Sequence, residues 1–206
     1  MMSERKPKTK IQVKSPTQKR SKQTVSSILE ACAKVIAREG YFAVTTDKIA
    51  VEAGVSIGSL YQFFGNKESV VSALIKQLIE DDRQFFFESM RPFENLPVQE
   101  RIPKMIEIGF EIYRLKPELR SSLQAVRLYL TDQDYLTQSR KIFSDFVRAN
   151  LPTIAAGRDP DKVAYITVTA FLSIMNNAVL GSPDLVNDPV LVDEMTLMFK
   201  KYLEIA

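Results

Sequence analysis

The N-terminal part of the chain changes from an irregular polar segment to a helical pattern at about Arg20. Apolar residues then recur three or four positions apart, and the run consists of Val25, Ile28, Leu29, Cys32, Val35 and Ile36. Gly40 ends this run, where a glycine commonly closes a helix. The pattern therefore predicts a first helix over about residues 21–39.

Two short helices are predicted next, and a glycine separates them. Thr45 or Thr46 can cap the first of them, because a threonine hydroxyl can accept a hydrogen bond from a free backbone N–H of the first turn. Gly54 supplies the positive φ that a tight turn between helices requires. Ser56 then caps the second short helix, which we expect over about residues 57–63.

The remainder of the chain reads as longer helices. Asn66 is placed to cap a fourth helix that ends at about residue 89. Three prolines punctuate a connection and a helix start, and they are Pro92, Pro97 and Pro103. An apolar helix from Ile102 to Tyr113 follows, and further helices are predicted over about 117–128, 133–149, 160–180 and 188–204. We find no strand pattern and no solenoid-length repeat, so the prediction is an all-α fold with about nine helices.

Charge divides the chain into a basic arm and a mildly acidic body. Residues 1–22 hold eight basic side chains and one acidic side chain, a net charge of +7, while the whole chain carries +3. Residues 23–206 therefore carry a net charge of −4. Residues 1–19 lack apolar periodicity and contain two prolines, which predicts a disordered arm. Such an arm favours a polyanionic partner, although a merely solubilising tail has the same composition.

Composition excludes several chemistries. The chain has one cysteine, Cys32, and no histidine, so it has no internal disulfide, no cysteine-based zinc site and no histidine base. We expect no metal and no cofactor, and no paired carboxylates stand out as a catalytic site, so the prediction is that the protein is not an enzyme. We see no apolar run of the roughly 18–20 residues that a membrane span needs and no signal peptide. Cytoplasmic residence without a membrane partner is therefore expected.

The two short helices have helix-turn-helix geometry, in which small residues let the helices cross closely. Their sequence closely resembles the N-terminal domain of the TetR family of regulators over about residues 21–75. The matching run is Gly40-Tyr41-x-x-x-Thr45-Thr46-x-x-Ile49-Ala50-x-x-Ala53-Gly54-Val55-Ser56-x-Gly58-Ser59-Leu60-Tyr61-x-Phe63-Phe64-x-x-Lys67-Glu68. The resemblance implies a DNA-binding domain over residues 20–75, with the fourth helix continuing to about 89 as a connector.

The resemblance also implies roles for individual residues. Thr46 and Lys67 resemble the family's phosphate contacts, and Tyr61 resembles an aromatic residue that touches backbone or bases. Thr45 is either a phosphate ligand or only a cap. The groove-facing residues of the recognition helix are Ile57, Gly58, Ser59 and Gln62. Ile57 is apolar where the family commonly has a polar or small residue, so it either contacts a thymine methyl group or is partly buried.

Residues 90–206 match the family in length and helical character, which implies a domain that binds an effector and forms a dimer. The helices over about 160–180 and 188–204 are too apolar for one small domain to cover, which favours pairing with a second copy. An effector pocket is predicted from apolar residues and from polar residues that need partners, and these are Phe86, Met105, Ile108, Gly109, Tyr113, Leu128, Tyr129, Phe143, Asn176 and Asn177. The expected effector is a mostly apolar small molecule and not an anion.

Together these features predict a homodimeric, sequence-specific DNA-binding regulator. The preferred hypothesis is a repressor that leaves a palindromic double-stranded DNA operator when the effector binds. The alternative is a ligand-independent or activating regulator, which the sequence does not separate from the first.

Overall fold

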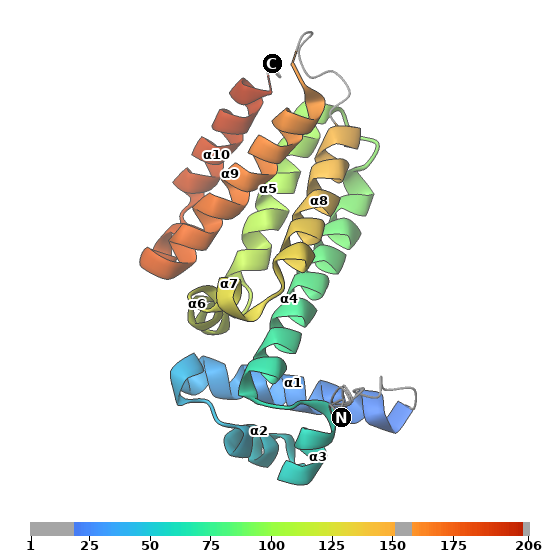
Figure 1. Ribbon diagram of the computed structural model, residues 1–206. Coiled ribbons are helices and arrows are strands. Elements are labelled where there is room, and N and C mark those ends of the chain that lie inside the picture. The colour runs from blue at the N-terminus through green and yellow to red at the C-terminus, as the bar shows by residue number, and fades with distance from the viewer. Residues whose placement is uncertain (1–18, 151–157, 204–206) are drawn as a thin grey trace, which may run out of the picture.

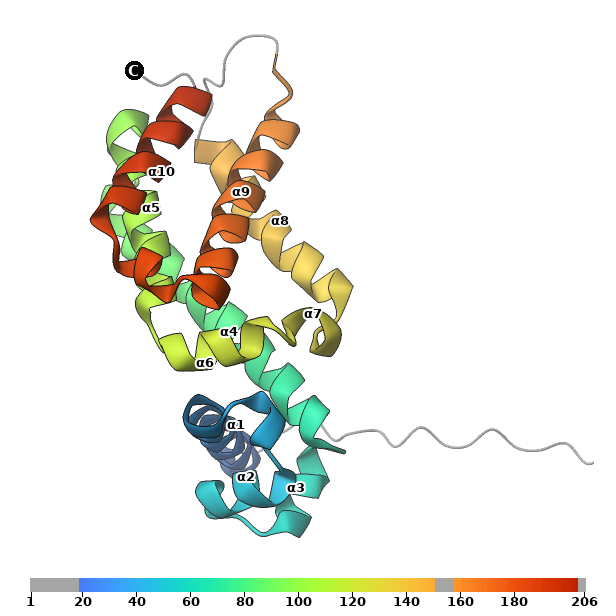
Figure 2. The same ribbon diagram turned by 90° about the vertical axis from the view of Figure 1, so that its left-hand side faces the viewer.

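The computed structural model describes residues 19–150 and 158–203, and these residues form ten α-helices, three 3-10 helices and no strand (Figures 1 and 2). The all-α prediction is thereby confirmed. The predicted arm lies outside the described residues except for Lys19, which begins the first helix. The elements are α1 (Lys19–Glu39), η1 (Tyr41–Ala43), α2 (Thr46–Ala53), α3 (Ile57–Phe63), α4 (Lys67–Met90), η2 (Arg91–Phe93), α5 (Val98–Arg114), α6 (Pro117–Gln124), α7 (Arg127–Leu130), α8 (Gln133–Asn150), α9 (Pro160–Gly181), η3 (Pro183–Asn187) and α10 (Pro189–Tyr202).

The molecule consists of a small lower head and an elongated upper body, joined by α4. Figure 1 shows α1, α2 and α3 at the bottom and the longer helices α5, α8, α9 and α10 running along the upper part of α4. The short helices α6 and α7 lie at the lower end of the body, and α6 lies directly above α1 (Figure 2). The head therefore meets the body through two elements, α4 and α6.

Two helix boundaries differ from the sequence prediction. The helix predicted from Ile102 starts earlier, at Val98, with Pro97 at its N-cap position, so Pro103 lies inside α5. Pro103 lacks the N–H that would bond the carbonyl one turn earlier, and the buried faces of Ile102 and Ile106 hold the helix together despite this loss. The predicted helix over 117–128 divides into α6 and α7, because the chain turns at Ala125–Val126.

Three buried clusters hold the described residues together. The first fills the head and continues into α6 and α7, because it contains Leu119, Leu123 and Val126 beside the apolar residues of α1 to α4. The second lies among α5, α8, α9 and α10, and the third lies where α4, α5 and α8 meet. The head and the lower body thus share one core.

Helix α9 corrects the expectation that no segment is long and apolar enough for a membrane. By length and composition alone α9 qualifies, and it is the one such helix among the described residues. Only 33% of its most apolar stretch is buried inside the protomer. A core helix of a soluble protein passes the same test. The unusual feature of α9 is therefore an apolar surface that its own protomer leaves uncovered.

Candidate DNA interface and effector cavity

The helix-turn-helix is built from α2, a glycine turn and α3. The Thr45 hydroxyl caps α2 by accepting a hydrogen bond from the Lys48 N–H at 3.3 Å, so Thr45 is the cap and Thr46 is the first helical residue. Gly54 has φ +65°, the left-handed conformation that the turn was predicted to need. Ile49 and Leu60 are fully buried between the two helices. These two buried apolar side chains therefore set the angle at which α2 and α3 cross.

Most of the predicted groove-facing side chains of α3 are exposed. Tyr61 is 52% exposed and Ile57 is 38% exposed, and Gln62 also faces solvent. A Cβ atom at Gly58 would meet nothing closer than the Ser56 hydroxyl at 3.9 Å, so the backbone of α3 is open to close approach there. The exposure of Ile57 favours contact with a partner over burial.

The Ser59 hydroxyl is less available than the other groups of α3. Ser56 caps α3 by accepting a hydrogen bond from the Ser59 N–H at 3.0 Å, and the two serine hydroxyls lie 2.8 Å apart. Ser59 is also only half-exposed. Its hydroxyl therefore has a local partner, and its role in reading a base stays a prediction.

Thr46 and Tyr61 lie together although fifteen residues separate them in sequence. Their hydroxyl oxygens are 3.2 Å apart, and either group can be the donor. This hydrogen bond joins the start of α2 to the exposed face of α3. Thr46, the predicted phosphate contact, and Tyr61, the predicted contact to backbone or bases, are thus held together, which the spacing of the residues did not reveal.

Lys67 occupies the first position of α4, after the Asn66 cap. Asn66 and Ser69 cap each other, with the Ser69 N–H donating to the Asn66 side chain at 2.8 Å. A positive charge is unfavourable at a helix N-terminus, because the helix dipole is positive there. The ammonium lies 4.5 Å from the centre of the Tyr41 ring, and this cation–π contact holds it beside the head. The arrangement suits an anion placed beyond the lysine.

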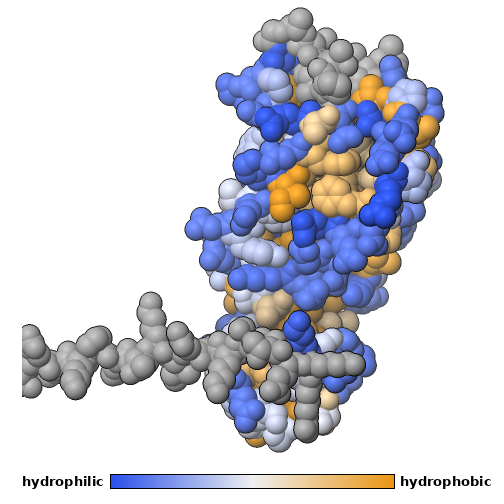
Figure 3. All heavy atoms as spheres, turned by 90° about the vertical axis from the view of Figure 1, so that its right-hand side faces the viewer, coloured by the Kyte–Doolittle hydropathy of each residue, from blue (hydrophilic) through white to orange (hydrophobic). Residues whose placement is uncertain are grey.

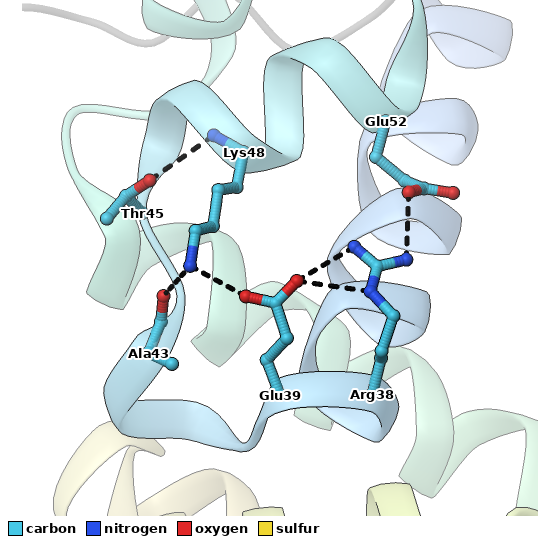
Figure 4. A network of polar contacts seen from close by, with 6 residues as sticks. All are labelled: Arg38, Glu39, Ala43, Thr45, Lys48 and Glu52. Atoms are coloured by element: carbon cyan, nitrogen blue, oxygen red, sulfur yellow. Dashed lines mark hydrogen bonds and ion pairs between the residues drawn. The ribbon is translucent and has the colours of Figure 1, made fainter.

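A network of ion pairs fixes α2 across the end of α1 (Figure 4). Glu39 accepts hydrogen bonds from Lys48 at 2.6 Å and from Arg38 at 2.9 Å, and Arg38 also reaches Glu52 at 3.2 Å. These cations lower the pKa of the Glu39 carboxyl, and Lys48 contributes most. Exposed ion pairs each contribute only about 0–1 kcal/mol, so the network orients α2 more than it stabilises the fold.

The body contains a largely apolar cavity of about 200 Å³ among α4, α5, α6, α7, α8, α9 and α10. It is larger than the cavity of roughly 150 Å³ that holds a benzene molecule in an engineered protein. Figure 3 shows an apolar area, bordered by hydrophilic residues, on the side of the body that carries α4 and α8. The space is therefore sufficient for a small organic ligand.

Six of the residues predicted from the sequence line this cavity, and they are Phe86, Met105, Gly109, Tyr113, Phe143 and Asn176. The other four lie elsewhere. Ile108 is buried in the third cluster, and the exposed Asn177 side chain donates to the Ser173 carbonyl. Leu128 and Tyr129 are 65% and 88% exposed, because α7 turns their side chains outward. The prediction that these four residues line the pocket was therefore wrong.

Neighbouring side chains explain why Tyr113 and Gly109 occupy their positions in the cavity lining. The Tyr113 hydroxyl donates to the Asn176 side chain at 3.0 Å, and burial raises the pKa of Tyr113 to about 12, so it is a neutral donor. Gly109 leaves room for the Phe171 ring, since a Cβ atom there would lie 2.9 Å from the ring's Cε1 atom. Part of the space that Gly109 provides is thus filled by the protein itself.

Sequence reasoning missed the charged residues of the cavity. Asp82, Arg120, Arg127 and Arg140 line it, and each reads in the sequence as part of a solvated helix face. Their convergence follows from how α4, α6, α7 and α8 pack, which residue spacing within one helix does not reveal. Among the described residues, no group of three or more acidic, histidine or cysteine side chains is placed to hold a metal ion.

Comparison with known proteins agrees with this geometry. The family model described as "Bacterial regulatory proteins, tetR family" matches residues 28–74. The uncharacterised HTH-type transcriptional regulator YhgD of Bacillus subtilis is 35% identical over 158 residues, which cover 72% of this chain and 80% of YhgD.

Solved structures share the fold. A fatty acid degradation regulator, FadR from Bacillus halodurans, superposes with a TM-score of 0.65 at 21% identity, covering 85% of this chain and 94% of FadR. A TetR-family transcriptional regulator from Streptomyces coelicolor superposes with a TM-score of 0.63 at 22% identity, covering 88% of this chain and 98% of that protein. At these identities the superpositions establish the fold alone.

Proposed function

This chain belongs to the TetR family of bacterial regulatory proteins, and we propose that it is a dimeric repressor that leaves a palindromic operator when a small molecule occupies its body cavity. As a member of this family it is a DNA-binding transcriptional regulator and not an enzyme. The proposal concerns the sign of regulation, the symmetry of the DNA site and the ligand.

The observation that carries the proposal is the exposed face of α3. Ile57, Gly58, Tyr61 and Gln62 face solvent while Leu60 is buried, so one side of α3 is fixed and the other is free to enter a major groove. Phosphate contacts from Thr46, Tyr61 and Lys67 would set the register of α3 on the duplex. Gln62 can form paired hydrogen bonds with an adenine.

Dimer formation is supported by an apolar surface on α9 and α10, which lie on the same side of the body in Figure 2. The exposed apolar side chains on these helices are Tyr165, Ile166, Leu180, Val190, Leu197 and Met198. We propose that a second copy covers this surface. A two-fold dimer would then present two α3 helices to the two halves of a palindrome, which strengthens binding over that of a single head.

Coupling between ligand and DNA is supported by residues that belong to both the cavity and the head. Ile75, Leu78 and Leu123 line the cavity and also belong to the buried cluster that holds α1 to α4 together. A ligand that moves α6 relative to α4 would therefore tilt the heads and change the distance between the two α3 helices. Ligand binding would then favour a state with lower affinity for the operator.

The DNA proposal is tested by selecting bound fragments from the genome that encodes the protein. We expect a palindrome whose half-sites are about one helical turn apart. Gly58→Glu should abolish binding to that DNA, because it puts a carboxylate against the duplex where the backbone now has open space. Tyr129→Phe on the exposed face of α7 is the matched control and should bind normally. Normal binding by Gly58→Glu would contradict the placement of α3 in the groove.

The dimer is tested separately by light scattering after size-exclusion chromatography. Leu197→Glu should give monomers that retain their helical content, while Leu128→Glu, which also adds a charge to an exposed leucine, should remain dimeric. A dimer that survives Leu197→Glu would place the interface elsewhere.

A further inference from the structure

The charged groups of the body cavity do not balance. Its charged lining residues are Asp82, Arg120, Arg127 and Arg140, three cations and one anion. The excess of two positive charges borders a space that is otherwise mostly apolar. Arg127 and Arg140 are only partly exposed, and a partly buried charge without a partner is less stable than a paired one, so this excess requires an explanation.

Arg120 already has its partners. Its guanidinium donates to both carboxylate oxygens of Asp82, at 2.9 and 2.6 Å, and its Nε donates to the Leu115 carbonyl at 2.8 Å. The one carboxylate of the cavity is therefore committed to one arginine. Arg127 and Arg140 have no ion pair with any residue that the structure describes.

Arg127 is the clearest case of an unused donor. Its Nε atom is buried and has no hydrogen-bond partner within residues 19–150 and 158–203. Its charge acts on the buried Tyr113 hydroxyl, as does that of Arg120, which places both cations near the same part of the cavity. A buried donor without a partner is rare in native proteins, so the Nε–H of Arg127 is available to an acceptor that enters the cavity.

The charged residues gather toward one end of the cavity, while apolar residues line its whole length. On α5 the lining runs from Ile102 at the top to Tyr113 at the bottom, eleven residues or about 16 Å along the axis. On α8 it runs upward from Ser139 and Arg140 to Phe146 and Val147. Arg120 and Arg127 lie on α6 and α7, which are at the lower end of the body (Figure 1), so the charged groups border the lower part of the cavity and the upper part is mostly apolar.

We propose that the effector is an amphipathic anion, with an acidic head group between Arg127 and Arg140 at the lower end of the cavity and an apolar chain that runs upward between α5 and α8. This inference rests on the proposed function, since it assigns the chemistry of the ligand that the cavity takes. A terminal carboxylate or phosphate supplies acceptors for both guanidinium groups. The acidic head group would then lie against α6 and α7, and α6 packs on α1 of the DNA-binding head.

The test compares amphiphiles that share one chain and differ in head group. Binding of dodecanoate, dodecyl phosphate, dodecan-1-ol and dodecyltrimethylammonium to the full chain is measured by titration calorimetry below their micelle concentrations. We expect at least one anion to bind once per protomer, about ten- to hundred-fold more tightly than the alcohol and the cation. The two anions together identify which acidic head is preferred.

Charge-removing variants locate the head group. Arg127→Gln and Arg140→Gln should each weaken binding of the preferred anion about ten-fold or more and leave binding of the alcohol unchanged. Arg148→Gln is the matched control, because Arg148 is on α8 but pairs outside the cavity with Asp161 at 3.4 Å. Arg127→Lys should restore part of the affinity that Arg127→Gln loses, which a purely structural role would not predict.

The outcomes separate this inference from the proposed function. The assignment of an anion is wrong if the alcohol or the cation binds as tightly as the anions. It is also wrong if neither Arg127→Gln nor Arg140→Gln weakens binding of the anion more than binding of the alcohol. In both cases the cavity remains a ligand site. If the anion binds as expected but leaves operator affinity unchanged, the release mechanism is wrong and the ligand chemistry stands. If none of the four compounds binds, the inference is overturned.

Discussion

Replacing Gly109 by alanine sets two opposing effects against each other in the middle of α5. Alanine stabilises a helix interior by about 1 kcal/mol relative to glycine. The added Cβ atom would lie 2.9 and 3.1 Å from the Cε atoms of Phe171, with the Cζ atom closer still. Such overpacking costs about 1–3 kcal/mol in a buried position. The packing term therefore wins, and we expect Gly109→Ala to lower the free energy of unfolding by up to about 2 kcal/mol.

The measurement is urea and thermal unfolding followed by circular dichroism. For a chain of this size about 1 kcal/mol corresponds to a shift of roughly 2–4 °C, so Gly109→Ala should lower the Tm by up to about 8 °C. Gly181→Ala is the matched control, because Gly181 lies at the end of α9 with no atom within 4 Å of its would-be Cβ atom. That variant should leave the Tm unchanged or raise it slightly.

A second substitution tests whether the clash with Phe171 causes the loss of stability. In a Phe171→Leu background the steric term is removed, so Gly109→Ala should become stabilising by about 1 kcal/mol. Phe171 also lines the cavity and packs edge-to-face on Phe110, with ring centres 6.1 Å apart. The displaced ring would move into the cavity, so Gly109→Ala should also weaken ligand binding. A higher Tm for Gly109→Ala in the wild-type background would refute the reasoning.

Three further predictions concern single groups. Arg127→Met should raise the Tm of the ligand-free protein by about 2–8 °C in a thermal melt, because it removes a buried donor without a partner; a lower Tm would show that the arginine stabilises the empty cavity. Tyr61→Phe should weaken operator binding about five-fold in a fluorescence anisotropy titration, by losing the hydroxyl that bonds Thr46, while unfolding is unchanged. Burial raises the pKa of Cys32 from 9.0 to about 12, so its contribution to stability is complete below pH 9 and is lost as the pH rises toward 12. Cys32→Ala should flatten the fall in the free energy of unfolding between pH 9 and pH 11, and an unchanged slope would assign that fall to other groups such as Tyr113.

Local signals were sufficient to predict the DNA-binding head from the sequence. Thr45, Gly54 and Ser56 act within one turn of their own positions, as a cap, a left-handed turn and a second cap, and the structure has all three. The hydroxyl pair of Thr46 and Tyr61 was not predicted, because it depends on the angle between α2 and α3. Helix periodicity fixes which face of each helix is apolar, but it does not fix how two helices cross.

The cavity was predicted only in part, for a related physical reason. An apolar or aromatic residue on a buried helix face has a good chance of lining any cavity, and six of the predicted residues do so. Leu128 and Tyr129 were misassigned because the helix predicted over 117–128 breaks into α6 and α7, which rotates the residues after the break. An arginine at the end of a short helix reads as solvated. Only the packing of α7 against the body turns Arg127 toward the cavity, and this is why the sequence predicted a mostly apolar effector and not an anion.

The position of α6 couples ligand binding in the cavity to the DNA-binding head. Leu119 and Leu123 are buried in the same cluster as the core of the head, so α6 cannot move without disturbing the packing of α1. Arg120 on the same helix is tied to Asp82 on α4 by two hydrogen bonds. An anion bound at Arg127 would lie next to this ion pair and compete with Asp82 for the guanidinium of Arg120. The charge of the effector, and not only its volume, would then act on the contact between α6 and α4, so an uncharged analogue that fills the cavity should bind without releasing the operator fully.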